Sequence, residues 1–506
     1  MDLRQIMAAL FIAAVAGLLL TAITIDYVDL PLWIDELHTS WTIHGEMQDI
    51  AQRAAFGNQS PLYFVVLKLL TLIAGHSESV LRSLSITSGI ACIVLMTFWA
   101  IQKKYDPILI LVASVMFASD RLVLLFAVEA RPYEFLMFLT IVLFVLQTVE
   151  VKHRLLTIGK DIGWTFCAAA MFYTHYTALP ILATMMAARW ITRPKHSHEH
   201  TQVFIIQAFI LILCGIPRLT HLFSIYEHRS QWTTFIKSEQ ATLQALIGIF
   251  PVLSLVGVPL VFMLIDKRYH SQNKHVPESD VQRVRAHGIL KTTILWALLP
   301  MLAAWICTRW NWVHWFFPRY LVAILPAYYL FLVASVSRIQ LRRYKYTAVL
   351  LCILCWGWQG HSAVSRVRDG TVAHKQENWK AIVQFLNSQT GTGNVLLMSG
   401  LIEDRGLSRG IPATHGSMTL HEYCQFPLRG MYRLDRRWNV IPLDSTDLTD
   451  ATLRPFLIAP RTWVVVRGRT RIEAWEKITR QTFHVQHYQK VKITGNVALF
   501  SWRRKP

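Results

Sequence analysis

The sequence has few charged residues and several long apolar runs. Only 16% of its 506 residues are Asp, Glu, Lys or Arg, and 53% are hydrophobic, whereas soluble globular proteins carry roughly a quarter charged residues. The apolar residues gather into runs close to the ~20 residues that a helix needs to cross a bilayer. The clearest runs are residues 6–25, 86–101, 203–216 and 320–336. This composition argues against a purely soluble enzyme.

The sequence also lacks a cysteine pattern and a nucleotide-binding loop. Six of its seven cysteines lie inside apolar runs, and Cys424 stands alone near the C-terminus. Such spacing indicates neither a disulfide framework nor a zinc site. No Gly-rich phosphate-binding motif is present. The sequence therefore assigns no cofactor and leaves a divalent metal open.

The positive charge follows a topological pattern. The chain carries a net charge of +20, and 17 of its Lys and Arg residues fall in five loops, at residues 103–104, 152–160, 189–195, 267–285 and 338–345. The loops between them are poor in basic residues, as the positive-inside rule expects when the basic loops are cytoplasmic. This part of the charge indicates membrane topology rather than a nucleic-acid partner. The N-terminus is then cytoplasmic, and residues 6–25 form an uncleaved signal anchor.

The alternation of apolar runs and polar loops divides the chain near residue 360. Residues 1–360 are predicted to form about 11 transmembrane helices, and residues 361–506 a soluble α/β domain outside the cytoplasm. Residues 25–82 form the first extracytoplasmic loop. The apolar stretch 61–75 within this loop is short for a span and contains Lys68. For these two reasons we expect this stretch to form an embedded or re-entrant helix. If it spanned the membrane instead, the N-terminus would lie outside the cytoplasm.

The C-terminal part has the patterns of short helices and strands. Residues 377–387 have helical spacing of apolar residues, and residues 472–478 also indicate a helix. Residues 394–398 and 462–466 are short apolar strands, and residues 491–502 form a final strand or hairpin around Gly495. Residues 361–506 hold 22 Lys and Arg against 11 Asp and Glu. A domain with this excess could meet anionic headgroups or an anionic acceptor.

Two adjacent carboxylates, Asp35 and Glu36, follow the first apolar run and are flanked by Trp33 and Leu37. Carboxylates at a bilayer surface are costly unless they are used or paired. Partial withdrawal from water raises the proton affinity of a carboxylate, which suits a general base. An ordinary solvated acidic loop would fit the same residues.

A second group of polar residues lies on the same predicted face of the membrane. Arginine binds phosphate bidentately, and a neighbouring tyrosine can donate to the same anion. The alternative is an interfacial ion pair with tyrosines in the aromatic belt. The residues are Glu129, Arg131 and Tyr133 between two runs, His175 and Tyr176 at a predicted helix end, and Arg319 and Tyr320 at the start of another helix.

The order of these short motifs resembles the GT-C membrane glycosyltransferases, in particular the bacterial branch related to protein mannosyltransferases and lipid A aminoarabinose transferases. The resemblance covers about residues 1–400. The motifs that carry it are Trp33-Ile34-Asp35-Glu36, Gln59-Ser60-Pro61-Leu62-Tyr63, Ser77-Glu78 to Leu81-Arg82, Glu129-Ala130-Arg131-Pro132-Tyr133, His175-Tyr176, Arg319-Tyr320-Leu321 and Glu377-Asn378-Trp379.

The resemblance implies a role for each matched residue. Asp35 would be the catalytic carboxylate, and Glu36 would orient the acceptor or, with Asp35, hold a divalent metal if the reaction uses one. Arg131 and Tyr133 would face the phosphate of a polyprenyl-phosphate sugar. The remaining substrate-binding candidates are Arg82, Arg319, Glu129, Tyr63, His175, Tyr176 and Tyr320.

The sequence also departs from that family pattern. Many relatives have Pro-Pro-Leu-Tyr where this chain has Ser60-Pro61-Leu62-Tyr63, and the aminoarabinose branch often has Lys just before the prolines, where Gln59-Ser60 stand here. The sugar and acceptor of that branch are therefore not carried over to this chain.

These observations predict an integral-membrane glycosyltransferase of the bacterial inner or plasma membrane, with its active site outside the cytoplasm. It would move a monosaccharide from a polyprenyl-phosphate donor to a glycan, lipid or protein acceptor, with inversion of the anomeric centre. A ligase or polymerase of lipid-linked glycans is one alternative. A membrane transporter or flippase is another, but the two related halves with Gly- and Pro-broken helices that transporters often have are not evident.

Overall fold

The computed structural model describes residues 1–503 apart from 152, 193–197, 228–235, 273–279, 363–376, 402, 405–406, 408–413, 416–417, 445–460 and 483–487. By its internal contacts the chain forms two compact units. Unit 1 comprises Met1–Val28 and Arg82–Ala373, and unit 2 comprises Asp29–Leu81 and His374–Pro506. The segment 29–81 therefore groups with the C-terminal part of the chain.

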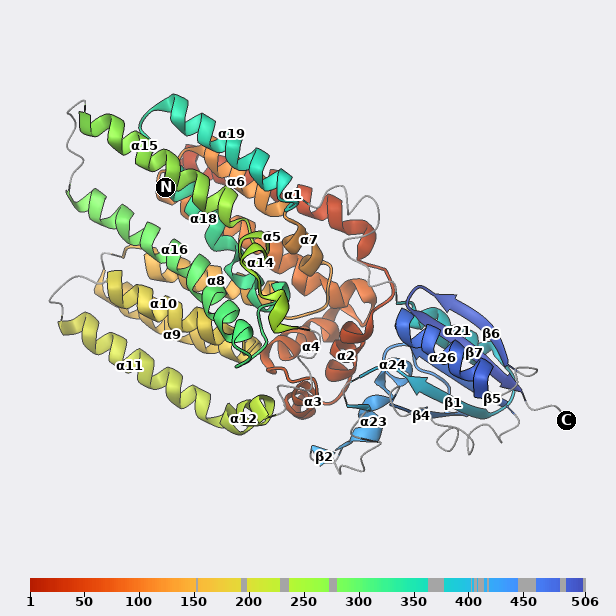
Figure 1. The fold of residues 1–506 in the computed structure, drawn as a ribbon. Coiled ribbons are helices and arrows are strands. Elements are labelled where there is room, and N and C mark those ends of the chain that lie inside the picture. The colour runs from red at the N-terminus through yellow and green to blue at the C-terminus, as the bar shows by residue number, and fades with distance from the viewer. Residues whose placement is uncertain are drawn as a thin grey trace. The chain divides into compact units, whose positions relative to one another are not determined.

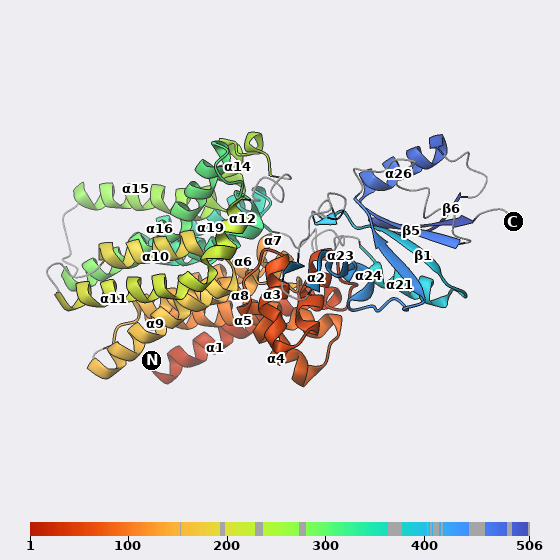
Figure 2. The same cartoon turned by 90° about the horizontal axis from the view of Figure 1, so that it is seen from below.

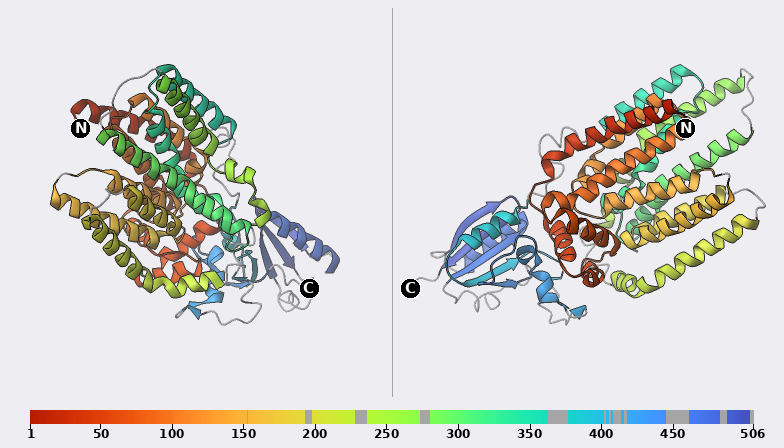
Figure 3. Two further views of the ribbon diagram at one scale, coloured as in Figure 1. Left: turned by 60° about the vertical axis from the view of Figure 1, so that its left-hand side comes forward. Right: turned by 180° about the vertical axis from the view of Figure 1, so that it is seen from behind.

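Unit 1 is helical, and its long helices run alongside one another (Figures 1 and 3). Its longer helices are α1 (Leu3–Thr24), α5 (Glu78–Gln102, of which Arg82 onward belongs to this unit), α6 (Pro107–Ala118), α8 (Tyr133–Thr148), α9 (Arg154–Thr174), α10 (Ala178–Thr192), α11 (His198–Gly215), α15 (Val258–Gln272), α16 (Asp280–Arg309), α18 (Leu325–Val336) and α19 (Arg342–Trp358). Shorter helical turns are η1 (Ile25–Tyr27), α7 (Arg121–Ala127), η3 (Ile216–Arg218), α12 (Leu219–Glu227), η4 (Ser238–Gln240), α14 (Leu243–Gly248), η5 (Leu253–Gly257), α17 (Pro318–Leu321) and η6 (Val322–Ile324).

Several of these helices are long and apolar enough to cross a bilayer. Within the described residues five stretches meet that description: Leu3–Tyr27, Glu78–Gln102, Thr201–Glu227, Gly288–Arg309 and Pro318–Val336. Shorter apolar helices accompany them, so the chain is an integral membrane protein. The count of 11 spans and the orientation stay predictions.

Helix α18 lies at the core of unit 1. Every residue from Leu325 to Val336 is buried, and α18 packs against α6 and α16. The core also contains a chain of polar groups: the Tyr329 hydroxyl donates to Asp120 Oδ2 at 2.7 Å, and the Trp356 indole N–H donates to the Tyr329 hydroxyl at 3.0 Å. Because buried polar groups are costly without partners, these bonds fix α18 and α19 to the start of α7.

Unit 2 contains a five-stranded sheet in its described part, with the order β4-β1-β5-β7-β6. Strands β1, β4 and β5 are parallel, and β7 runs antiparallel to β5 and β6. Helices α21 and α26 lie on opposite faces of the sheet (Figure 2). The strands are β1 (Gly393–Met398), β4 (Trp438–Pro442), β5 (Arg461–Arg467), β6 (Tyr488–Thr494) and β7 (Val497–Arg503), and the helices are α21 (Trp379–Ser388) and α26 (Arg469–Thr482).

The sequence patterns of the C-terminal part are confirmed by these elements. The helical spacing of residues 377–387 corresponds to α21, whose Trp379, Ile382, Val383 and Leu386 are all buried. The two apolar runs are β1 and β5, and residues 472–478 lie within α26. Gly495 has a φ of +65° in the turn between β6 and β7, a conformation that glycine adopts without strain.

The first segment of unit 2 is a set of short helices. They are α2 (Ile34–His44), η2 (Met47–Asp49), α3 (Ile50–Phe56) and α4 (Leu62–Ala74). Helix α2 packs against α3 and α4 and also against α24 (Phe426–Arg429) of the C-terminal part. The remaining described elements are β2 (Thr414–His415), β3 (Met418–Thr419) and α23 (Leu420–Cys424).

Aromatic rings join the two segments of unit 2. The His38 ring lies 5.9 Å from the Tyr423 ring and 5.8 Å from the Phe426 ring, centroid to centroid. The rings of Phe56 and Tyr423 stack at 4.9 Å. Edge-to-face and offset aromatic contacts add to the free energy of area burial. Residues 29–81 are thus packed into the C-terminal unit rather than forming an isolated loop.

Candidate functional site

Five of the candidate substrate-binding residues lie together in unit 1. The guanidinium carbon of Arg131 is 5.8 Å from the centroid of the Tyr133 ring, and the Tyr133 and His175 ring centroids are 5.5 Å apart. The His175 ring lies 6.3 Å from the Tyr320 ring, over which the Arg319 guanidinium is placed at 5.4 Å. We call these five residues the arginine–tyrosine cluster. The fold therefore joins three motifs that are far apart in the sequence.

The backbone around Arg131 is held by a serine of helix α5. The Ser85 hydroxyl lies 2.6 Å from the carbonyl oxygen of Glu129 and 3.3 Å from that of Arg131, and it donates to them. The Arg131 N–H donates to the Glu129 carbonyl at 2.8 Å, which makes a tight turn before α8 begins at Tyr133. Because Pro132 presets a φ suited to the start of a helix, Tyr133 leaves this turn in a fixed direction.

His175 is neutral in this cluster. Its side chain is buried at the end of α9, and burial, together with the neighbouring charges of Arg131 and Arg319, lowers its pKa to about 3. Its Nδ1 lies 2.9 Å from the Thr177 hydroxyl. The charge of the cluster at neutral pH thus comes from its two guanidinium groups. Such a site favours an anion with several acceptor oxygens, such as a phosphate.

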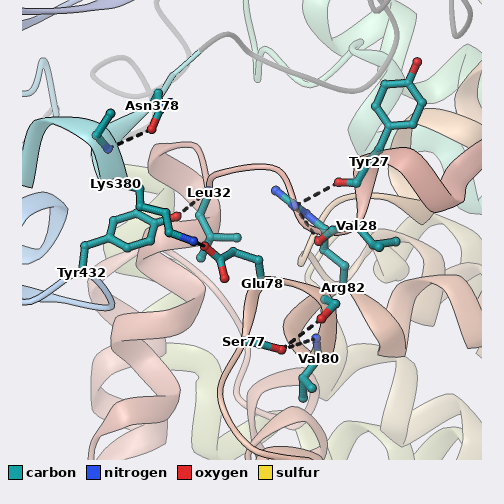
Figure 4. Close-up of polar contacts among 12 residues, drawn as sticks. Tyr27, Val28, Leu32, Ser77, Glu78, Val80, Arg82, Asn378, Lys380 and Tyr432 are labelled. Carbon is teal, nitrogen blue, oxygen red and sulfur yellow. Dashed lines mark hydrogen bonds and ion pairs between the residues drawn. The ribbon is translucent and has the colours of Figure 1, made fainter. Parts of the chain in front are cut away.

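Three other candidates of unit 1 have different surroundings. The Arg82 guanidinium donates to the backbone carbonyls of Tyr27 at 3.1 Å and Val28 at 2.9 Å (Figure 4). It therefore satisfies carbonyl groups where α1 and η1 end. The Tyr176 hydroxyl lies 2.6 Å from Nδ1 of His221 in α12. Glu129 is buried, and its carbonyl accepts the serine bond described above.

Asp35 and Glu36 lie in the first turn of α2 in unit 2, where carboxylates interact favourably with the helix dipole. The Asp35 side chain is half-buried. Glu36 is completely buried, and its Oε2 accepts the backbone N–H of Trp33 at 3.3 Å. Glu36 thus contributes to the start of the helix that carries Asp35. Tyr63 is also completely buried in α4.

The residue before Asp35 is anchored by a glutamate of the C-terminal part. Oε2 of Glu377 accepts the backbone N–H of Ile34 at 3.1 Å and the indole N–H of Trp379 at 2.9 Å. Its Oε1 accepts from Nε of Arg467 at 2.7 Å. Glu377 is only 3% exposed, so these bonds are shielded from water. The start of α2 is consequently fixed to the sheet domain through one carboxylate.

Two further contacts join residues 29–81 to the C-terminal part within unit 2. The Tyr432 hydroxyl accepts the Leu32 backbone N–H at 2.8 Å, and Nζ of Lys380 pairs with Oε1 of Glu78 at 2.8 Å (Figure 4). The sequence motifs did not identify Lys380 or Tyr432. Their partners are hundreds of residues away, so a single sequence carries no local signal for them.

A metal is the remaining candidate ligand. Over the described part of the chain, no group of three or more His, Cys, Asp or Glu side chains is arranged to hold a metal ion. Glu36, one of the two metal candidates, faces the backbone of Trp33. A metal held by Asp35 and Glu36 stays a prediction from the sequence.

Comparisons with known proteins identify the fold. No family model and no curated protein sequence matches the chain. Two solved structures of ArnT from Cupriavidus metallidurans do match, each over 97% of both chains at 12% sequence identity. The apo structure matches with a TM-score of 0.57, and the structure bound to undecaprenyl phosphate with a TM-score of 0.54. At this level of identity the likeness concerns the fold. The fold that the resemblance of the motifs implied is thus confirmed over 97% of the chain.

Proposed function

We propose that this protein is an integral-membrane glycosyltransferase that moves a monosaccharide from a polyprenyl-phosphate donor to an acceptor outside the cytoplasm. The fold is shared with ArnT, and one of the ArnT structures holds undecaprenyl phosphate. The observation that carries the proposal is the arginine–tyrosine cluster, where two arginines meet around a neutral histidine. The shared fold and this cluster both support a sugar donor that carries a lipid-linked phosphate.

The arginine–tyrosine cluster would bind the donor phosphate. Arg131 and Arg319 present planar guanidinium groups that match phosphate oxygens, and Tyr133 and Tyr320 can donate from their hydroxyls. Negative charge develops on the leaving phosphate as its bond to the sugar breaks. Hydrogen-bond donors that are already in position around that charge stabilise the transition state without reorganisation of the site. His175 stays neutral beside them and adds no further positive charge to be balanced.

Asp35 would be the general base. It takes the proton from an acceptor hydroxyl while that oxygen attacks the anomeric carbon of the donor sugar. The bond between that carbon and the phosphate oxygen breaks, and the polyprenyl phosphate leaves with its electron pair. One direct displacement of this kind inverts the anomeric centre. The hydrogen bond from Ile34 to Glu377 fixes the backbone next to this carboxylate.

The membrane orientation is part of this proposal. Basic loops in the cytoplasm would leave the N-terminus inside and residues 25–82 and 361–506 outside. Residues 1–360 would then form the transmembrane domain and residues 361–506 the soluble domain. A donor carried on a lipid suits this side, where nucleotide sugars are not supplied. The acceptor would be a glycan, a lipid or a protein.

Binding of undecaprenyl phosphate to the purified full-length protein tests the donor site. We expect Arg131→Gln to weaken binding about ten-fold or more, because a hydrogen bond to a charged group contributes about 1.5–3 kcal/mol. Arg309→Gln is the matched control, since Arg309 is an exposed arginine at the end of α16 in the same unit. Equal affinities of the two variants would contradict the proposed donor site.

A further inference from the structure

Helix α4 of unit 2 has one buried face and one exposed apolar end. It has 13 residues, about 20 Å of helix, which is shorter than the ~30 Å hydrocarbon core of a bilayer. Tyr63, Phe64 and Leu67 are buried in the unit. The far end of the helix instead exposes large apolar side chains, which we call the apolar tip: Leu69 (50% exposed), Leu72 (66%) and Ile73 (88%).

Basic side chains lie next to this tip. Lys68 belongs to the same helix, and His76 follows its end. The His76 ring lies 6.0 Å from the ring of His44 at the end of α2, and Nη2 of Arg433 lies 3.4 Å from Nε2 of His44. We call these four residues the basic rim. Chain segments that are distant in the sequence thus bring two cations, Lys68 and Arg433, and two imidazoles to one place beside exposed apolar side chains.

Two residues of the basic rim, Lys68 and Arg433, carry no ion pair within the described part of the chain. The pKa of His44 is lowered by burial and by Arg433, Arg53 and Lys68, and that of His76 by burial and by His44, Lys68 and Arg433. Neighbouring cations therefore raise the cost of protonating either imidazole. A bound anion would relieve this repulsion.

A further cation near His44, Arg53, has partners of its own and is not part of the rim. Arg53 is acted on by the carboxylates of Asp49 and Glu422, and it donates to the backbone carbonyl of Trp41 at 2.9 Å. Lys68 and Arg433 are the charged groups that act on both His44 and His76.

We propose that the apolar tip and the basic rim together bind the surface of an anionic bilayer. The tip enters the boundary between headgroups and acyl chains, and the rim contacts lipid phosphates. Apolar side chains at one end of a short helix with Lys and Arg beside them are the pattern of helices that lie in a membrane interface. Basic residues near such a surface are attracted to anionic lipids. This inference is independent of the proposed transferase activity, because it requires neither donor nor acceptor.

Hydrogen exchange of the full-length protein in nanodiscs tests this directly. The lipid is phosphatidylcholine, with or without phosphatidylglycerol. We expect amide exchange in residues 66–76 to be about five-fold slower with phosphatidylglycerol for each basic residue engaged. The variant Lys68→Gln/Arg433→Gln should lose this difference. The control Arg469→Gln/Lys477→Gln removes two exposed charges from α26 of the same unit and should keep it.

The same experiment monitors folding. Unchanged exchange in β5 and α21 shows that the sheet domain of each variant is intact. Equal exchange of residues 66–76 in the two lipids would overturn the proposal. So would a phosphatidylglycerol effect that survives in Lys68→Gln/Arg433→Gln. A result of this kind would leave the donor-binding experiment unaffected, since undecaprenyl phosphate binding is measured at the arginine–tyrosine cluster.

Discussion

Glu377 accepts a hydrogen bond from the backbone N–H of Ile34, 343 residues earlier in the chain, at an Oε2 to N distance of 3.1 Å. Ile34 is the first residue of α2 and directly precedes Asp35. The same carboxylate is paired with Arg467 of β5 at 2.7 Å. The sheet of unit 2 thereby holds the turn that presents Asp35. If Asp35 is the base, Glu377 is a positioning residue, and the C-terminal part of unit 2 contributes to catalysis without touching the substrate.

The hydrogen bond between Ile34 and Glu377 can be removed by deleting the N–H of Ile34. Ile34→Pro deletes the N–H, and proline is tolerated at the first position of a helix. Trp33 already has the extended conformation that a residue before proline requires, with φ −86° and ψ 173°. We expect kcat for sugar transfer to fall about ten-fold with little change in the donor KM, because misplacement of a reacting group lowers the rate of the chemical step.

Ile34→Val is the control for this experiment, since it shortens the buried side chain and keeps the N–H. A second test changes the side chain that accepts this hydrogen bond. Glu377→Gln should act in the same direction as Ile34→Pro, whereas Glu476→Gln breaks an ion pair with Lys490 elsewhere in unit 2 and should leave kcat unchanged. The positioning role is rejected if Ile34→Pro and Ile34→Val have the same kcat.

The low pKa of His175 predicts a dependence of stability on pH. The folded protein holds this pKa at about 3, while an unfolded chain has a histidine pKa of about 6.5. Between these values the unfolded state binds a proton that the folded state does not, so stability falls as the pH falls. Because of His175 alone, the free energy of unfolding is expected to fall by about 2 kcal/mol between pH 6.5 and pH 5.

The thermal unfolding midpoint of the detergent-solubilised protein, measured against pH, checks this prediction. The variant His175→Asn removes the titrating group and should show a shallower fall of the midpoint below about pH 6.5. A control with His314→Asn changes a half-buried histidine of the same unit and should follow the original protein. Identical pH profiles for His175→Asn and the original protein would contradict a neutral His175.

The sequence predicts much of this architecture because local patterns determine it. Apolar runs give the helices of unit 1, and short apolar strands give β1 and β5. The arginine–tyrosine cluster could be anticipated because its three motifs fall on loops or helix ends of one predicted face. Hydrogen bonds between residues that are far apart in the sequence could not be anticipated. The His221 partner of Tyr176 and the carbonyl partners of Arg82 depend on how helices pack, which no local spacing encodes.

Glu36 and Glu377 show the same limit from two directions. The sequence suggested that Glu36 orients an acceptor or a metal, and its complete burial and bond to the Trp33 N–H indicate a role at the start of α2. Glu377 was noticed only within a motif of the resemblance. Its bonds to Ile34 and Arg467 come from a tertiary arrangement of unit 2. In both cases the sequence does not predict which backbone N–H the carboxylate accepts.

The assignment of Asp35 as the base is the central claim, and one measurement tests it most directly. Sugar transfer from the lipid-linked donor is compared between the original protein, Asp35→Asn and Asp29→Asn, where Asp29 is an exposed aspartate of the same segment. We predict that Asp35→Asn binds undecaprenyl phosphate normally but transfers sugar about 10²-fold or more slowly, as expected for loss of a general base, while Asp29→Asn retains full activity. Undiminished transfer by a normally folded Asp35→Asn protein would contradict the account.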